Sequence, residues 1–235
     1  MDSAMQRKRK IDWWHGSRRV TVVVDNPSWI LPYAELLVAE LNESKDQATL
    51  VRRCDDIPEG DVTFFLGCIS LTPPEILGRN RTNLVVHESN LPEGRGFSPL
   101  TWQILAGENE IPVALLHMTH EMDAGPVAFK EFLHFKGNEL LDELRSAQGQ
   151  ATIALCRRFL DASTYPQGVP QVGLPTYFRR RRPEDSRLDP HRSIAEQFNL
   201  MRVVDNEKYP AFFDLAGQRY FLYIEKAPSD QMSQK

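Results

Sequence analysis

The chain has 235 residues, of which 41% are hydrophobic, and it carries a formal net charge of −4. This composition is typical of a globular protein with one sizeable core, and the negative charge argues against general attraction to nucleic acid or anionic lipid. No apolar run approaches the roughly 20 residues that span a bilayer. The three cysteines, Cys54, Cys68 and Cys156, have no metal-type spacing, so we expect a reduced, cytoplasmic protein without a metal site.

Strand-like and helix-like segments alternate along the first two thirds of the chain. Apolar runs predict strands over 20–24, 48–51, 62–66, 83–86 and 112–116, with an edge strand over 128–135. Helices are predicted over 31–42, from residue 72 onward, over 98–105 with Ser98 as its cap, and over 139–160. This alternation predicts an α/β fold with a mostly parallel sheet covered on both faces.

The chain is expected to have four parts. Residues 1–18 are rich in Lys and Arg and predict a flexible basic arm, and residues 19–165 form the α/β domain. A shift to Pro, Gly and Gln after residue 160 predicts a C-terminal extension over 166–226 that packs on the core. Within it we expect a helix over 193–204 and a closing strand over 220–224, followed by a flexible tail over 227–235.

The stretch from residue 85 to residue 127 contains the most informative polar groups. His87 follows one buried strand, Asp123 lies in a Met-Asp-Ala-Gly turn after another, and a loop punctuated by Pro and Gly separates them. Ligands of open α/β sheets bind beyond the carboxyl ends of the strands, where Asp25 is also expected. Taken alone, each residue is as readily a structural histidine or a turn aspartate. Together they predict acid–base chemistry on a rigid scaffold.

The intervening residues resemble a known enzyme family. His87, Ser89, Leu91, Pro92, Arg95 and Gly96, followed by Asp123 and Gly125, are similar to the signature of the N10-formyltetrahydrofolate-dependent formyltransferases. A closer resemblance, in stretches 25–30, 87–92, 96–102, 182–186, 196–200 and 205–211, is to short sugar N-formyltransferases of pseudaminic acid biosynthesis. The resemblance implies a Rossmann-like formyltransferase fold and N10-formyltetrahydrofolate as donor. It also implies an acceptor amine on a nucleotide-linked sugar, UDP-4-amino-4,6-dideoxy-N-acetyl-altrosamine.

The resemblance implies that His87 and Asp123 are catalytic, and it exposes one departure. The family has an Asn two residues before the His, and this chain has Val85 there. We expect Asn90, or a backbone N–H, to replace that amide as the donor to the oxyanion. Asn83 would face the same side of the strand as Val85, but it lies further back along it.

The resemblance also implies binding residues. For the folate they are Leu91, Pro92, Gly96, Met118, His120 and Met122, and for the acceptor they are Asp25, Asn26, Trp29, Trp102, Tyr177 and Arg179. The alternatives are structural, because Leu91 and Met122 also suit a core and Trp102 lies on a predicted amphipathic helix. The run of arginines over 179–182 fits a solvated loop or a nucleic-acid patch as well as a diphosphate site.

Other functions stay open at this point. Val85 is compatible with a catalytically silent protein that binds folate or a nucleotide sugar, and another amino sugar could be the acceptor. An acyltransferase that uses coenzyme A is disfavoured, because no Gly-rich pyrophosphate loop is visible. The chain after residue 175 is too short for the β-barrel of the tRNA-formylating enzyme, so we expect no nucleic-acid partner and no membrane partner.

Overall fold

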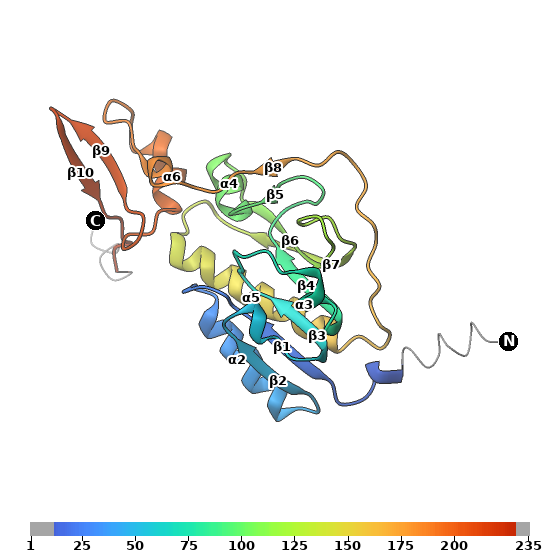
Figure 1. The fold of residues 1–235 in the computed structure, drawn as a ribbon. Coiled ribbons are helices and arrows are strands. Elements are labelled where there is room, and N and C mark those ends of the chain that lie inside the picture. Colours follow the sequence, from blue (N-terminus) through green and yellow to red (C-terminus); the bar gives the residue numbers. More distant parts are fainter. Residues whose placement is uncertain (1–11, 229–235) are drawn as a thin grey trace.

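The computed structural model describes residues 12–228, and its larger part is a sheet flanked by helices (Figure 1). In chain order its main elements are β1 (Arg19–Val23), α2 (Leu31–Glu43), β2 (Gln47–Val51), β3 (Gly60–Phe65), α3 (Pro74–Leu77), β4 (Asn80–His87), β5 (Arg95–Gly96), α4 (Pro99–Leu105), β6 (Glu110–His117), β7 (Val127–His134) and α5 (Leu141–Leu160). The C-terminal segment, residues 166–228, adds β8 (Tyr177–Phe178), α6 (Phe198–Arg202), β9 (Ala211–Leu215) and β10 (Gln218–Leu222). We call residues 12–165 the α/β body.

The sheet of the α/β body is mixed, with the strand order β2-β1-β3-β4-β6-β7. The pairings of β1 with β2, β1 with β3 and β3 with β4 are parallel, whereas β6 is antiparallel to both β4 and β7. The predicted α/β class and mostly parallel sheet are therefore confirmed. The reversed direction of β6 was not predicted, and the turn that follows this strand has to fold back to approach the end of β4.

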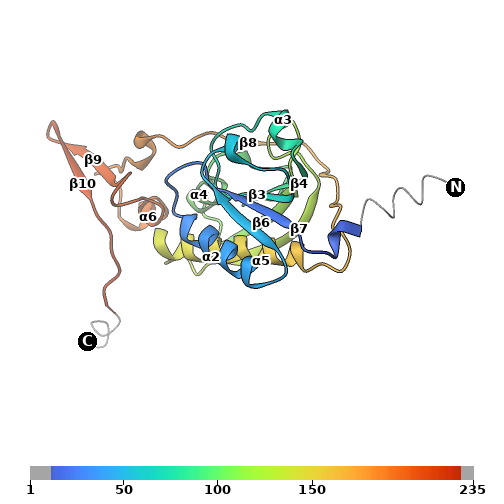
Figure 2. The ribbon, with the colours of Figure 1, turned by 60° about the horizontal axis from the view of Figure 1, so that its bottom comes forward.

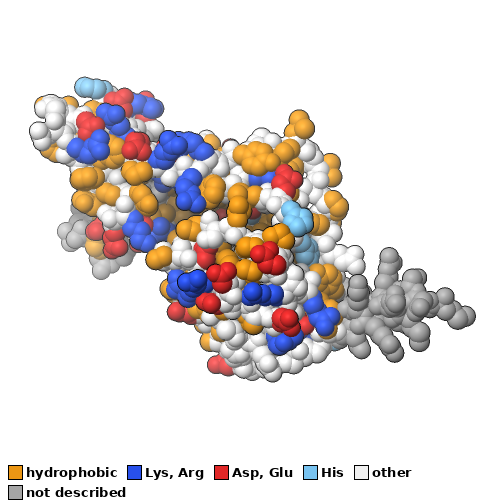
Figure 3. Space-filling view, in the orientation of Figure 1, with side chains coloured by type: hydrophobic (Ala, Val, Ile, Leu, Met, Phe, Trp, Pro, Cys, Tyr) orange, Lys and Arg blue, Asp and Glu red, His pale blue; other side chains and the backbone are white. Residues whose placement is uncertain are grey.

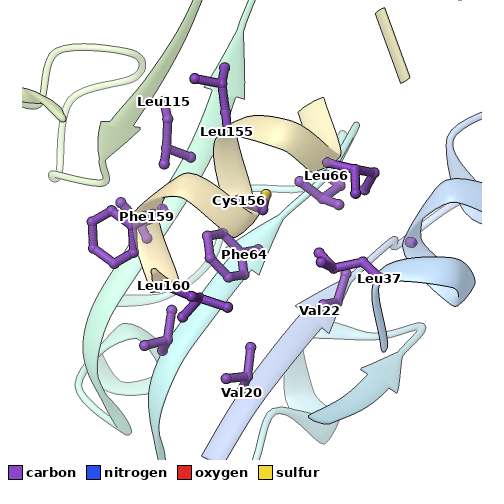
Figure 4. Close-up of a cluster of buried hydrophobic side chains, with 14 of the residues drawn as sticks. Val20, Val22, Leu37, Phe64, Leu66, Leu115, Leu155, Cys156, Phe159 and Leu160 are labelled. Carbon is purple, nitrogen blue, oxygen red and sulfur yellow. The ribbon is translucent and has the colours of Figure 1, made fainter. Parts of the chain in front are cut away.

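The two faces of the sheet are covered unequally (Figure 2). Helices α2 and α5 cover one face, where apolar side chains from β1, β3, β6 and both helices form the largest cluster of the core (Figure 4). The opposite face is covered by α3 and a short 3-10 helix, η2 (Cys54–Asp56), over a smaller cluster around Val23, Phe65 and Ile76. Because α3 and η2 are short, loops surround the carboxyl ends of the parallel strands. The polar residues gather in these loops.

The last residues of the expected basic arm pack on the body. Residues 1–11 lie outside the described residues, but Trp14 is 1% exposed and its indole N–H donates to the carbonyl of Ala162 over 2.8 Å. The buried guanidinium of Arg18 forms an ion pair with Asp46 at 2.7 Å and donates to the carbonyl of Leu160 at 2.6 Å. A buried charge is tolerated when its donors are satisfied in this way. The segment from residue 12 to residue 18 is therefore part of the body.

The C-terminal segment departs from prediction in two places. The helix expected over 193–204 is divided into the 3-10 helix η4 (Ala195–Gln197) and α6. The strand expected over 220–224 is β10, which pairs antiparallel with β9 in a separate hairpin and does not close the main sheet. Val203 reaches the cluster of Leu100 and Ile104 on the body, while Met201, Val204 and Ala211 form a small cluster within the segment.

The structure adds two observations on composition. No helix within residues 12–228 is long and apolar enough to cross a membrane. In the same range, no group of three or more His, Cys, Asp or Glu side chains is arranged to hold a metal ion.

Candidate active site

His87 is the last residue of β4, and its ring is enclosed between two acceptors. The side chain is 6% exposed, and Nε2 donates to the carbonyl of Gly94 over 2.8 Å. Nδ1 faces the Oδ2 of Asp123 at 3.6 Å. Because the carbonyl of Gly94 can only accept, Nε2 carries the hydrogen of the first contact, whereas the distance from Nδ1 to Asp123 is longer than a hydrogen bond. The two residues that sequence reasoning paired, 36 positions apart, do meet in the structure.

Asp123 is positioned by an unusual turn. Its φ of 53° places it in the left-handed region, which Asp adopts more readily than most residues. A Cβ on Gly125 would lie 1.7 Å from the carbonyl oxygen of His117, so only glycine fits this close approach. The Oδ2 of Asp123 also accepts from the backbone N–H of Gly96 at 2.9 Å. The turn therefore returns the carboxylate to the loop beside His87.

The loop over 91–96 is held by the C-terminal segment. Strand β5 in this loop pairs in parallel with β8, and Thr176 Oγ1 accepts from the N–H of Gly94 at 2.8 Å. Gly96 has a φ of 103°, and a Cβ there would lie 2.4 Å from the carbonyl oxygen of Phe178. The loop that faces His87 thus depends on residues more than 80 positions away in the chain.

Arg95 and Gln171 complete this wall of the site and were not predicted. The buried Arg95 donates to Glu121 at 2.7 Å and to the Gln171 side-chain oxygen at 2.8 Å. The amide of Gln171 in turn donates to the carbonyls of Asp123 and Gly125. Arg95 belongs to the family-like signature and could have been marked for that reason. Gln171 lies in an irregular Pro- and Gly-rich stretch that gives no pattern to read.

The expected folate residues are divided by the structure. Pro92 is buried in the loop after a cis peptide bond with the half-buried Leu91, close to Gly96. Met118 is half-buried and packs against the apolar cluster of the opposite sheet face, and His120 and Met122 are exposed. Of the expected folate residues, only Leu91, Pro92 and Gly96 lie in the loop that contacts His87.

The position of the family's missing Asn is apolar. Asn83, Val85 and His87 alternate along β4 and so share one face of the sheet. The amide of Asn83 donates to the carbonyl of Leu77 at 2.9 Å, and its own oxygen is buried without a partner among the described residues. Asn90 is exposed, and its side-chain oxygen accepts from Lys130 on β7.

Asp25 and Asn26 organise the turn after β3. The Asp25 carboxylate accepts from the backbone N–H groups of Ile69 and Ser70, and Asn26 donates to Asp25 and to the carbonyl of Gly67. Burial acts to raise the pKa of Asp25, but these hydrogen bonds outweigh it and hold the pKa below its ordinary value. Both side chains therefore form hydrogen bonds within this turn.

A cavity of about 430 Å³ opens next to this site, and we call it the arginine cavity. Its wall includes Trp29, Glu88, Phe97, Gln148, Arg180, Arg181, Arg182 and Tyr209. Basic side chains gather on the surface between α4 and α6 (Figure 3). Neither His87 nor Asp123 lines this cavity, but Glu88, the residue after His87, does. Of the expected acceptor residues, only Trp29 belongs to it.

The other expected acceptor residues lie on a neighbouring surface. The exposed Arg179 pairs with Asp185 and lies over the Trp102 ring, 4.7 Å from its centroid. The Trp102 indole donates to the carbonyl of Arg179, and the exposed Tyr177 donates to Glu121. Of the arginine run over 179–182, the three that follow Arg179 line the cavity, and sequence reasoning did not distinguish them.

Comparison with known proteins agrees with this geometry. The model of the formyl transferase family matches residues 38–155, which is half of the chain. The structure is similar to a methionyl-tRNA formyltransferase from Clostridium thermocellum, with a TM-score of 0.75 and 25% identity over 89% of this chain and 93% of that one.

Two further solved structures share the fold at lower identity. A 4-N formyltransferase from Francisella tularensis has a TM-score of 0.64 and 16% identity over 90% of this chain and 98% of that one. HypX from Aquifex aeolicus, in complex with tetrahydrofolic acid, has a TM-score of 0.66 and 16% identity over 89% of this chain and 38% of that one. The fold, the enclosed His and Asp pair and the family match agree: this chain belongs to the formyl transferase family.

Proposed function

We propose that this protein transfers a formyl group from N10-formyltetrahydrofolate to the amine of a nucleotide-linked amino sugar. The first acceptor to consider is UDP-4-amino-4,6-dideoxy-N-acetyl-altrosamine of the pseudaminic acid pathway. The observation that carries the proposal is the His87 ring enclosed beside Asp123, together with the next residue, Glu88, which lines a cavity with Arg180, Arg181 and Arg182. The folate-bound HypX structure supports the donor, and the Francisella 4-N formyltransferase supports an amine acceptor.

The proposed chemistry needs an acid–base pair and no metal. The neutral amine attacks the formyl carbon, and the carbonyl electron pair moves to oxygen to give a tetrahedral oxyanion. When this intermediate collapses, the bond to N10 breaks and N10 takes up a proton, while the amine loses one. His87 stabilises the oxyanion and Asp123 orients the imidazole, each contribution being worth a few kcal/mol.

A second donor to the oxyanion is proposed from the loop. Lys130 holds the side-chain oxygen of Asn90, which leaves the NH₂ group of that amide without a partner among residues 12–228. This group, or a backbone N–H of the loop, takes the place of the family's Asn, whose position is Val85. The pterin ring is proposed to lie against the loop over 91–96 and the turn over 118–122.

The arginine cavity supports a phosphate-bearing acceptor. Guanidinium groups bind phosphate oxygens through paired hydrogen bonds, and Arg180, Arg181 and Arg182 form no ion pair with any described carboxylate. Asp185, three residues after Arg182, pairs instead with Arg179. Aromatic walls at Trp29 and Tyr209 suit a sugar or a base.

The test is a transfer assay with two acceptors. Purified protein with N10-formyltetrahydrofolate and the UDP-amino sugar is expected to release tetrahydrofolate and to yield a product heavier by one formyl group. Methionyl-tRNA serves as the parallel acceptor, because the Clostridium neighbour is a methionyl-tRNA formyltransferase. Formylation of methionyl-tRNA alone would refute the sugar acceptor, and no transfer to any amine would refute the enzyme.

One observation favours a second candidate. With Val85 in the Asn position and a His87 side chain that is 6% exposed, the chain also suits a silent folate or nucleotide-sugar binding protein. That candidate expects folate binding with no transfer, and a residual rate that does not change in His87→Ala. A fall of that rate in His87→Ala would exclude it.

A further inference from the structure

Glu88 is a buried carboxylate that the fold does not neutralise. The residue is 8% exposed, and its Oε1 accepts one hydrogen bond, from the Gln148 amide at 2.7 Å. No Lys, Arg or His among residues 12–228 forms an ion pair with it. Burying a charge without a charged partner costs several kcal/mol, so such a group usually has a function.

Gln148 is the one described side chain that donates to this carboxylate, and neither carboxylate oxygen is among the fully enclosed unpartnered atoms of the structure. Burial raises the pKa of Glu88, the charge of His87 lowers it, and the charge of Asp123 raises it further. Glu88 is therefore close to the His and Asp pair, yet it lines the arginine cavity.

The arginine cavity is lined by groups of both charge types. The Glu88 carboxyl group lines it together with Arg180, Arg181 and Arg182. The Nε of Arg181 is buried and unpartnered, and Arg180 lies over the Phe97 ring at 4.5 Å. Arg145 and Asp205, which also line the cavity, neutralise each other through an ion pair at 2.9 Å. The cavity therefore combines one carboxyl group with three guanidinium groups, none of which has an ion-pair partner among residues 12–228.

We propose that Glu88 binds the amine of the acceptor while the arginines bind its phosphates. An amine donates N–H to a carboxylate, and a carboxylate beside His87 would hold the nucleophile next to the formyl carbon. Glu88 follows His87 directly in the chain and lines the arginine cavity, so one substrate bound there can reach both residues. A volume of about 430 Å³ lies within the range of ligand pockets. This inference rests on the proposed function and adds the residue that selects an amine-bearing sugar nucleotide.

The decisive comparison uses two ligands and calorimetric binding without folate. The first is UDP-4-amino-4,6-dideoxy-N-acetyl-altrosamine, and the second is UDP-N-acetylglucosamine, which has no free amine. The wild type is expected to bind the amine-bearing ligand at least about tenfold more tightly, the value of a hydrogen bond to a charged group. Glu88→Gln keeps the shape and the contact with Gln148, and it is expected to bind both ligands alike.

Two further variants separate this role from a structural one. Arg182→Gln is expected to weaken both ligands equally, because both carry phosphates. Glu108→Gln removes the same charge from an exposed position after α4 and is expected to keep the wild-type preference. Glu88→Gln should melt no lower than the wild type, since it removes an unpaired buried charge.

The outcomes distinguish this inference from the function on which it rests. A preference for the amine that survives in Glu88→Gln, or a wild type that binds both ligands alike or neither, would overturn the role of Glu88. The formyl transfer assay is read separately on the wild type. Transfer without a Glu88-dependent preference would leave the proposed function standing and remove this inference alone.

Discussion

The α/β body and the C-terminal segment are each stabilised by different interactions. The body buries a large apolar cluster between its sheet and helices α2 and α5. The C-terminal segment has a small cluster, and its hairpin exposes Tyr220, Phe221 and Tyr223. Several interactions within the segment are surface ion pairs, such as those of Arg187 and Arg219 with Asp214. Surface ion pairs contribute little to the stability of a protein in water.

Both regions nevertheless contribute to the site. The body supplies His87 at the end of β4 and Asp123 in the turn between β6 and β7, and the segment supplies Gln171, Thr176 and Arg180, Arg181 and Arg182 of the cavity. The proposed chemistry is thus placed on the region with the larger core, while the proposed recognition is placed on the region with the smaller one. The predictions below test this division, beginning with the largest expected effect.

Removing the imidazole should abolish most of the chemistry. His87→Ala is expected to lower kcat/KM for formyl transfer by about 10²- to 10⁴-fold, the usual contribution of a general acid–base group. His134→Ala on β7 is the control, because that exposed histidine pairs only with Glu110. Equal values of kcat/KM in the two variants would contradict a catalytic role for His87 of the α/β body.

Opening a cavity in the core should show where the stability resides. Phe159 on α5 is fully buried against Trp14 and Phe64, so Phe159→Ala is expected to lower the free energy of unfolding by about 3–5 kcal/mol. Phe221→Ala on the exposed hairpin should change it by about 0.5 kcal/mol or less. Urea denaturation measures the free energy of unfolding of both variants. A similar loss in each would contradict the difference in stability between the body and the hairpin.

Loosening the turn that carries Asp123 should reduce activity more than stability. Gln171→Ala removes the amide that donates to the carbonyls of Asp123 and Gly125, and kcat/KM is expected to fall by roughly tenfold or more as the carboxylate loses its position. Gln167→Ala, at an exposed position of the same stretch, is the matched control. Unchanged kinetics in Gln171→Ala would show that the segment does not position the turn.

The smallest effect concerns acid. The hydrogen bond from Arg179 lowers the pKa of Asp185 to about 2, from an ordinary value of 3.8. A lowered folded-state pKa stabilises the protein above pH 3.8, and this stability is lost as the pH falls toward 2. Melting temperatures of the wild type and Asp185→Asn should therefore differ at pH 5 and converge toward pH 2. A constant difference would contradict the ion pair.

The sequence predicted most of the body because its strands are continuous apolar runs. The predicted strand over 62–66 and the helix over 139–160 match β3 and α5 within a few residues. The direction of β6 could not be predicted, since an apolar run looks the same in parallel and antiparallel pairing. Ser98 was expected to cap α4, but it has a positive φ and its side chain makes no capping bond.

The site was predicted where a short motif carries its own geometry. His87, the loop and Asp123 are joined by a signature, and the structure brings them together. Gln171 and the cavity arginines act through long-range packing of an irregular segment, which has no periodicity. The two-residue strands β5 and β8 are too short to leave a pattern, although they fix the loop.

The contacts of Trp14 and Arg18 have a practical consequence for anyone shortening this protein. Both side chains donate to carbonyls at the end of α5 or just beyond it. The first described residues of the body therefore satisfy carbonyl groups at the carboxyl end of its last helix. Deleting residues up to the first strand would uncover those carbonyls and a fully buried aromatic surface. Expression plasmids should therefore retain the chain from Asp12 onward, and affinity tags belong upstream of that residue.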